Sequence, residues 1–153
     1  MKLISHRGNL NGKNPEKENQ PDYIEKALSS NYQVEIDVWY MPDVSKFFLG
    51  HDEPQYPIKK NFLNRADLWC HAKNIFALEK LTELSLSSAF FWHQKDDFTL
   101  TSNNFIWTYP GQKLGQRSIA VLPETVDYKL SSLKKSAGIC SDCIQVFERK
   151  IKI

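Results

Sequence analysis

The sequence predicts a single α/β domain whose sheet is mainly parallel or closed into a barrel. Its 153 residues are the length of one domain, and no repeat, low-complexity stretch or linker divides residues 1–153. Apolar segments of strand length alternate with segments of helical periodicity, which is typical of parallel strands joined by crossover helices. A complete eightfold barrel uses at least ~200 residues. We therefore expect a reduced (β/α) barrel in which several helices are shortened or missing.

The first third of the chain alternates strand, helix and strand. Residues 2–5 form an expected short strand, and a polar, asparagine-rich loop follows. Pro21 suits the first turn of a helix, because the apolar residues after it fall at helical spacing. Apolar and polar residues alternate over 33–40, as they do in a strand. After a turn, residues 46–49 return as a short strand that ends just before His51.

The alternation continues through the rest of the chain. A strand is expected over 68–71, a helix capped by Asn74 runs to about residue 85, and an apolar strand covers 89–93. Shorter strands are expected over residues 98–101, 105–108, 118–122 and 138–141, with a short helix around 125–133. The links between the middle strands are shorter than the dozen residues that a parallel crossover needs. Either tight loops replace helices there or some of these strands pair antiparallel.

Composition excludes several classes of protein. The formal net charge of +2 is small and scattered, so we expect no nucleic-acid partner. No segment approaches the ~20 apolar residues of a membrane span, so no integral membrane segment is expected. The first residues lack the long apolar stretch of a signal peptide, and three cysteines are an odd number for a disulfide framework. A cytoplasmic protein is the expectation.

Two carboxylates share one face of a predicted strand. Glu35 and Asp37 lie two residues apart, so their side chains leave the strand on the same side. One interpretation is the solvated face of an amphipathic strand. In an α/β fold, however, a strand is usually covered on both sides, and two unpaired carboxylates there are costly unless they bind a cation. Oxygen ligands favour Mg²⁺ or Ca²⁺.

All four histidines fall at or just past predicted strand ends, where barrel folds place their reactive groups. They are His6, His51, His71 and His93. A single histidine in such a place is most often a surface residue, but four of them favour a functional cluster. Histidine titrates near neutrality and carries protons. Next to His6, Arg7 can bind a phosphate through two parallel hydrogen bonds.

Four short motifs, in this order, resemble those of the glycerophosphodiester phosphodiesterases. They are His6-Arg7-Gly8, Glu18-Asn19, Glu35-Ile36-Asp37 and His51-Asp52. This family belongs to the phospholipase-C-like phosphodiesterases, which have TIM-barrel folds, so the resemblance implies that the reduced barrel is TIM-like. The match is specific over residues 3–52. Beyond them it thins to Lys73, which resembles the lysine after the third strand of the family, and to a closing Ser141-Asp142.

The resemblance implies a reaction and a set of roles. His6 and His51 would be the general acid and base, while Arg7 and Lys73 would contact the phosphate of a small-molecule substrate. Enzymes of the family hydrolyse glycerophosphodiesters to glycerol 3-phosphate and an alcohol. Relatives attack with a hydroxyl of the substrate itself and form a cyclic phosphate. A protein that binds the phosphate ligand without catalysis is the alternative from another class.

The metal site departs from the family pattern. Glu35 and Asp37 match two metal ligands, but the family usually has a glutamate two residues before the lysine, and here His71 stands in that place. Histidine is neutral and softer than a carboxylate. We expect weaker Mg²⁺ binding, a preference for Mn²⁺ or Zn²⁺, or an acidic ligand from elsewhere in the chain, such as Glu124.

The remaining residues of the predicted site form its walls. The resemblance implies that Glu18 and Asn19 line the site. His93 and Trp107 either line the substrate pocket or pack in the core, and an aromatic pocket wall would suit the alcohol part of the substrate.

Overall fold

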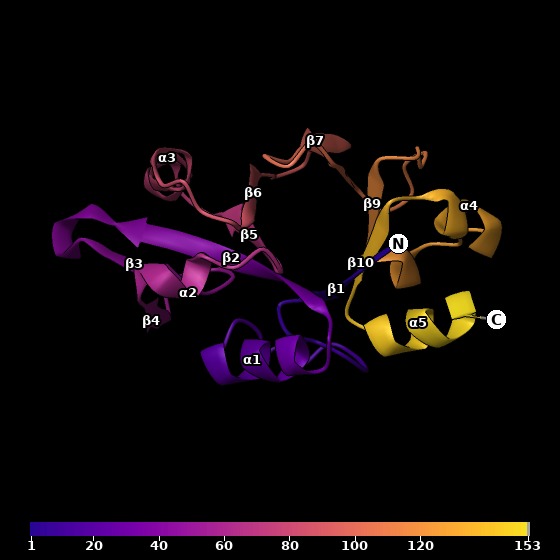
Figure 1. Cartoon of the computed structure of the whole chain (residues 1–153), viewed down its shortest axis with the longest axis horizontal. Helices are drawn as coiled ribbons and strands as arrows, with labels where there is room; N and C mark the ends of the chain where they lie inside the picture. The colour runs from indigo at the N-terminus through magenta and orange to yellow at the C-terminus, as the bar shows by residue number, and fades with distance from the viewer. Residues whose placement is uncertain (153) are drawn as a thin grey trace.

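The computed structural model describes residues 1–152. Its ten strands form a single curved sheet (Figure 1). The strands are β1 Lys2–His6, β2 Gln33–Met41, β3 Lys46–Leu49, β4 Tyr56–Ile58, β5 Leu68–Ala72, β6 Ala89–Trp92, β7 Phe98–Leu100, β8 Ile106–Thr108, β9 Ser118–Val121 and β10 Gly138–Ser141. The helices are α1 Pro21–Ser29, α2 Lys60–Leu63, α3 Ile75–Glu83, α4 Leu130–Lys135 and α5 Ile144–Lys152, with 3-10 turns η1 Pro42–Val44 and η2 Pro123–Thr125.

The sheet is mixed. Strands β6, β5, β2, β1, β10, β9 and β8 run parallel in that order, while β3 and β4 and the edge strand β7 are antiparallel additions. One edge of β2 serves two partners, because β1 pairs with its first half and β3 with its second half. Because β1 and β3 share this edge, the residues at or just after the end of each, His6-Arg7 and His51, lie near Glu35 and Asp37 of β2.

The expectation of a reduced TIM-like barrel was wrong. The sheet curls into an open half-barrel, and among the described residues no strand ladder joins β6 to β7 or β8. Helices are few and short, and they do not alternate regularly with the strands: α1, α3 and α4 each join two parallel neighbours, but no α-helix lies in the described residues between β6 and β9. The cause lies in the connections, since the links from β6 to β7 and from β7 to β8 are too short for a helical crossover. The second of them closes an antiparallel hairpin instead.

The longer elements form where the sequence predicts them. Pro21 is the first residue of α1, whose Ile24 and Leu28 are buried. Asn74 caps α3, and its side-chain oxygen accepts a hydrogen bond of 2.8 Å from the backbone N–H of Ala77. Ile75, the first residue of this helix, is 55% exposed. α3 packs against β2, β5 and β6, while α5 packs against β1 and β10.

The contact between β1 and β10 is close enough to require glycine at position 138. A Cβ atom on Gly138 would lie 2.8 Å from both the Cβ and the carbonyl oxygen of Lys2 on the paired strand. We expect Gly138→Ala to lower the free energy of unfolding by about 1–3 kcal/mol, because backbone cannot move aside easily. Gly115→Ala is the control, since the nearest atom there is Ser118 Oγ at 3.9 Å. Urea unfolding measures both, and equal effects would contradict the prediction.

Within residues 1–152, no helix combines the length and the apolar character needed to cross a bilayer.

Candidate active site

Three strands bring the predicted catalytic residues together around Asp37. β1 ends at His6, which pairs with Glu35 of β2, and the chain after β3 begins with Gly50, whose N–H donates to the Asp37 carbonyl over 3.2 Å. His51 follows Gly50, so both predicted acid–base histidines meet at one point of the β2 edge. On the opposite edge, β5 places its histidine directly beside Asp37 in the parallel register.

Two of the predicted site residues have an uncommon backbone conformation, which sets the direction of their side chains. Arg7 and Asn19 both have left-handed backbone, with φ of 53° and 63°, which is uncommon for residues with a Cβ. Hydrogen bonds hold this conformation, because Arg7 N–H donates to the Glu35 carbonyl over 2.9 Å and Asn19 N–H donates to the Arg7 carbonyl over 3.1 Å. Gly8 follows with φ of 93°, and a Cβ there would lie 2.6 Å from a ring carbon of Tyr23.

Asp37 is fully buried and is surrounded by donors and cations. Its partners are Arg7 Nε at 2.8 Å, Asn19 Nδ2 at 2.9 Å, His71 Nδ1 at 3.0 Å, His51 Nδ1 at 3.3 Å and Lys73 Nζ at 3.5 Å. Burial alone would raise the pKa of Asp37, but the bonds from the histidines and the charge of Arg7 hold it well below its ordinary value. Asp37 is therefore a carboxylate in the folded protein.

Glu35 lies beside Asp37 in the opposite electrostatic situation. It is 2% exposed, and its Oε2 atom has no hydrogen-bond partner. The nearest basic nitrogen atoms are His6 Nε2 and His71 Nδ1, each at 3.8 Å. Burial and the negative charge of Asp37 raise the pKa of Glu35. A buried carboxylate without a partner is costly, so this position calls for a cation.

His6 is oriented by a residue from the far end of the chain. Its Nδ1 lies 2.7 Å from Asp142 Oδ1, which also accepts a hydrogen bond of 2.8 Å from Asn9 Nδ2. Because the carboxylate accepts, Nδ1 carries the proton and Nε2 faces Glu35. Burial would lower the pKa of His6, but the bond to Asp142 and the charge of Glu35 outweigh it and raise that pKa.

Asp142→Asn is expected to lower the pKa of His6, because it removes a charge-assisted hydrogen bond to the imidazolium. Titration of the His6 ring signals by NMR measures this pKa directly. Asp127→Asn is the matched control, since Asp127 is exposed and should leave the His6 titration unchanged. An unchanged His6 pKa in the Asp142 variant would show that the carboxylate does not set it.

Arg7 is held in place by a second buried carboxylate. Its Nη1 donates to Glu18 Oε2 over 3.0 Å, while Asn9 Nδ2 donates to Glu18 Oε1 over 2.9 Å. Glu18 lines only a small side cavity of ≈ 160 Å³, and Asn19 holds Asp37 by two hydrogen bonds of 2.9 Å. Glu18 and Asn19, both predicted to line the pocket, therefore lie behind the active-site cavity described below. They position Arg7 and Asp37.

The residues present fit a divalent cation. One ligand atom each from Glu35, Asp37 and His71 lies within 4.8 Å of the others. His71 Nε2 is 2.8 Å from the His93 carbonyl, which can only accept, so Nε2 carries a proton whether or not a metal is bound. Its Nδ1 lies 3.0 Å from Asp37 Oδ1 and would give up its hydrogen bond to that oxygen in order to bind a metal. The orphaned Glu35 oxygen supplies a second ligand atom.

The charge of the site also favours a cation. Arg7 and Lys73 are its permanent cations. The buried carboxylates that contact them or the histidines are Glu18, Glu35, Asp37 and Asp142, and the exposed Asp52 lies 3.6 Å from His51 Nε2. Glu124, the alternative acidic ligand, lies elsewhere, because its Oε1 accepts a hydrogen bond of 2.8 Å from the backbone N–H of Asp142. It stabilises the loop that carries Asp142.

A cavity of ≈ 390 Å³ opens on this cluster, a volume suited to a small molecule. The predicted residues that line it are His6, Arg7, Glu35, His51, His71, Lys73, His93 and Trp107. Tyr109 adds a second aromatic side chain to the wall. Nδ1 of His93 lies 3.2 Å from Thr99 Oγ1, and burial lowers the pKa of His93. This histidine is a neutral part of the wall.

Sequence reasoning named Asp142 only as part of the closing Ser141-Asp142 motif, without assigning it a role, and it missed Asn9. The signal for Asp142 is its place directly after the last strand, in the dipeptide Ser141-Asp142, whereas a single asparagine in a polar loop gives none. Comparisons with protein-family models, with curated proteins and with solved structures find no match to this chain.

Proposed function

We propose that this protein is a divalent-metal-dependent phosphodiesterase that hydrolyses glycerophosphodiesters to glycerol 3-phosphate and an alcohol. The observation that carries the proposal is one cavity lined by two histidines, two permanent cations, and the Glu35 and His71 members of a Glu–Asp–His cluster whose Asp37 lies buried behind them. These are the groups that a phosphodiester needs, namely proton carriers, an anion clamp and a cation site. The three free cysteines support the expected cytoplasmic location.

Arg7 and Lys73 bind the phosphate in this proposal. Both line the cavity, and the guanidinium is fixed from behind by Glu18 and Asp37, so little side-chain entropy remains to be lost when the substrate binds. Fixed cations that face a phosphoryl group stabilise the charge that develops in the transition state.

Glu35, Asp37 and His71 would hold the cation, which when bound polarises a phosphoryl oxygen as a Lewis acid. The chain itself supplies the proton transfers. The raised pKa of His6 favours its protonated form, which suits the acid that protonates the leaving alcohol as the P–O bond breaks. His51, which is half-exposed and 3.3 Å from Asp37, takes the proton of the attacking water as the water oxygen forms its bond to phosphorus.

Phosphorus NMR of a panel of glycerophosphodiesters, incubated with Mg²⁺, Ca²⁺, Mn²⁺ or Zn²⁺, tests the function. The expected product is glycerol 3-phosphate, formed only with metal. A cyclic phosphate would identify the cyclising reaction instead. No turnover with any metal, despite ligand binding by calorimetry, would contradict the enzymatic function.

That last outcome corresponds to a second candidate, a protein that binds a phosphate ligand without catalysis. The observation that favours it is the closed set of partners around Asp37, whose oxygens already contact Arg7, Asn19 and His71. A carboxylate so fully engaged has less capacity left for a metal.

A further inference from the structure

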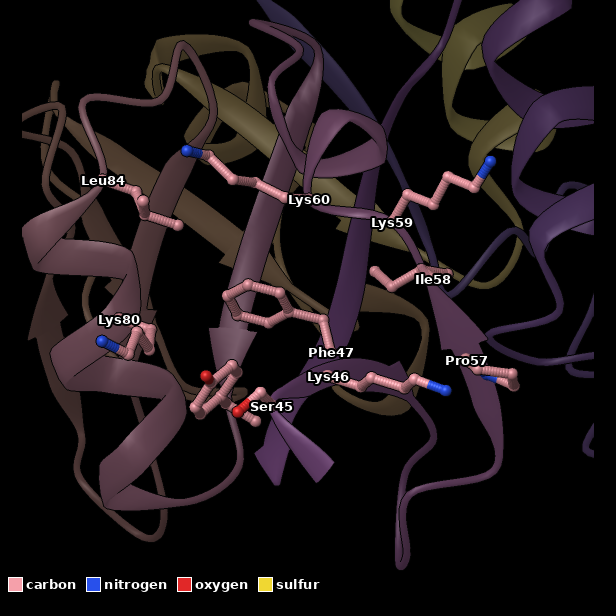
Figure 2. Close-up of a pocket in the computed structure, with 10 residues that line it drawn as sticks. Ser45, Lys46, Phe47, Pro57, Ile58, Lys59, Lys60, Lys80 and Leu84 are labelled. Carbon is pink, nitrogen blue, oxygen red and sulfur yellow. The ribbon is translucent and has the colours of Figure 1, made fainter. Parts of the chain in front are cut away.

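A second cavity lies outside the candidate active site. It has a volume of ≈ 680 Å³ and lies between α3 and the β3–β4 hairpin, and none of its lining residues lines the active-site cavity (Figure 2). Its floor is apolar. Tyr40 and Phe47 lie there with ring centroids 4.9 Å apart, and Ile58 and Leu84 line the sides.

Lysines alone supply the charge around this floor. Lys46, Lys59, Lys60 and Lys80 line the cavity, and no acidic residue does. Lys80 is already engaged, because it pairs with Glu83 at 2.7 Å and lies over the Tyr40 ring. Among residues 1–152 the other three have no ion pair.

Two of the unpaired lysines extend along the cavity. In Figure 2 the side chain of Lys60 runs across the view toward Leu84, and that of Lys46 runs beneath Ile58 toward Pro57. Lys59 points away from them. In this view the Phe47 ring lies between the side chains of Lys60 and Lys46.

We propose that this cavity binds a small amphiphilic anion, a molecule whose apolar body covers Phe47 and whose single carboxylate or phosphate group meets Lys46 or Lys60. The apolar floor supplies hydrophobic burial, and the unpaired ammonium groups select for negative charge. A second copy of the chain would bring lysines against lysines, which charge repulsion disfavours. An extended membrane surface does not fit a floor residue that is recessed, since Phe47 is only 6% exposed.

This site is independent of the proposed phosphodiesterase function, so its test does not depend on turnover. Octanoate, octyl phosphate and the neutral octanol, each below its aggregation concentration, are titrated into isotope-labelled protein. NMR then gives both the affinity and the residues whose signals shift. We expect both anions to shift the signals of Phe47, Ile58 and Leu84 and to bind at least tenfold more tightly than octanol.

The variant Lys46→Glu/Lys60→Glu is expected to weaken octanoate binding at least tenfold. Lys113→Glu/Lys129→Glu has the same change in net charge at exposed positions outside the cavity, and should change the affinity less than twofold. If charge reversal prevents folding, Lys46→Gln/Lys60→Gln gives the same test. A difference between the two anions identifies the preferred head group.

Three results would overturn the proposal. Equal affinity for octanol and octanoate would mean that the lysines do not select charge. Equal losses in the two charge-reversal variants would mean that only net charge matters. Binding to anionic phospholipid vesicles, with none to monomeric octanoate or octyl phosphate, would make the lysines a membrane contact.

Discussion

His6→Ala is expected to lower kcat/KM for glycerophosphodiester hydrolysis by about 10²–10⁴-fold, the usual contribution of a positioned acid or base. The fold should survive. His6 contacts Asp142 through its side chain, but Asn9 Nδ2 continues to donate to the same carboxylate oxygen when the imidazole is removed. His51→Ala should have an effect of the same size, and its half-exposed side chain makes a loss of folding still less of a concern.

His93→Ala is the matched control for these variants. It removes the same type of side chain from the wall of the same cavity, but its ring contacts Thr99 and not a carboxylate. We expect a loss of less than about tenfold, and circular dichroism and thermal melts show whether each variant is folded. Turnover of the His6 variant at the level of the His93 variant would rule out the assigned proton transfer.

The second large effect concerns Glu35, and it has opposite signs for stability and for activity. Glu35→Gln replaces a buried, unpartnered carboxylate beside Asp37 by a neutral amide, so the metal-free protein should gain about 1–3 kcal/mol of stability at neutral pH. The same change removes a proposed metal ligand, so metal-dependent turnover should be lost.

The pH dependence of this gain follows from the raised pKa of Glu35. The folded protein holds the proton more tightly than the unfolded chain, so the stability of the wild type falls as the pH rises from the ordinary glutamate pKa through the raised one. Glu35→Gln lacks this contribution. The stability difference between the two proteins should therefore be small in acid and grow as the pH rises through that range.

Thermal melts with and without Mn²⁺ measure both sides of this prediction. Metal at a hundredfold excess over its dissociation constant stabilises a protein by about 2.7 kcal/mol, which is a rise in Tm of about 5–10 °C for a domain of this size. The wild type should show the rise and Glu35→Gln should not. Glu79→Gln, on the exposed surface of α3, should behave as the wild type does. A full metal-induced rise in the Glu35 variant would place the metal elsewhere.

The sequence predicted the elements whose signals are local. The strand β2 is recognisable from its alternation, and α3 from Asn74 followed by residues at helical spacing. The reasoning that both faces of β2 are covered is confirmed, since Glu35 and Asp37 are buried like the apolar Ile36 between them. Even so, α5 was missed, although Ile144 and Phe147 form an apolar face three residues apart.

The open, half-barrel form of the sheet and the complete site could not be predicted, because both depend on contacts between residues distant in sequence. Periodicity identifies a strand but not its partner, so the antiparallel pairing of β7 with β8 and the open edge at β6 carry no local signal. The same holds for Asp142, whose carboxylate reaches His6 only through the pairing of β1 with β10. The predicted site residues of the first third lie close together because β1 and β3 pair with the same edge of β2.

The link between His6 and Asp142 joins residues 136 positions apart. During synthesis the chain emerges from the ribosome from its N-terminus, so His6 appears early and has no carboxylate to orient it until β10 and the residue after it have been made. Contacts of such long range form late, since the loop between them must close first. The orientation of His6 therefore depends on β10 having joined the sheet, and a chain cut short before Asp142 would keep His6, Glu35 and Asp37 but lack the carboxylate that orients His6.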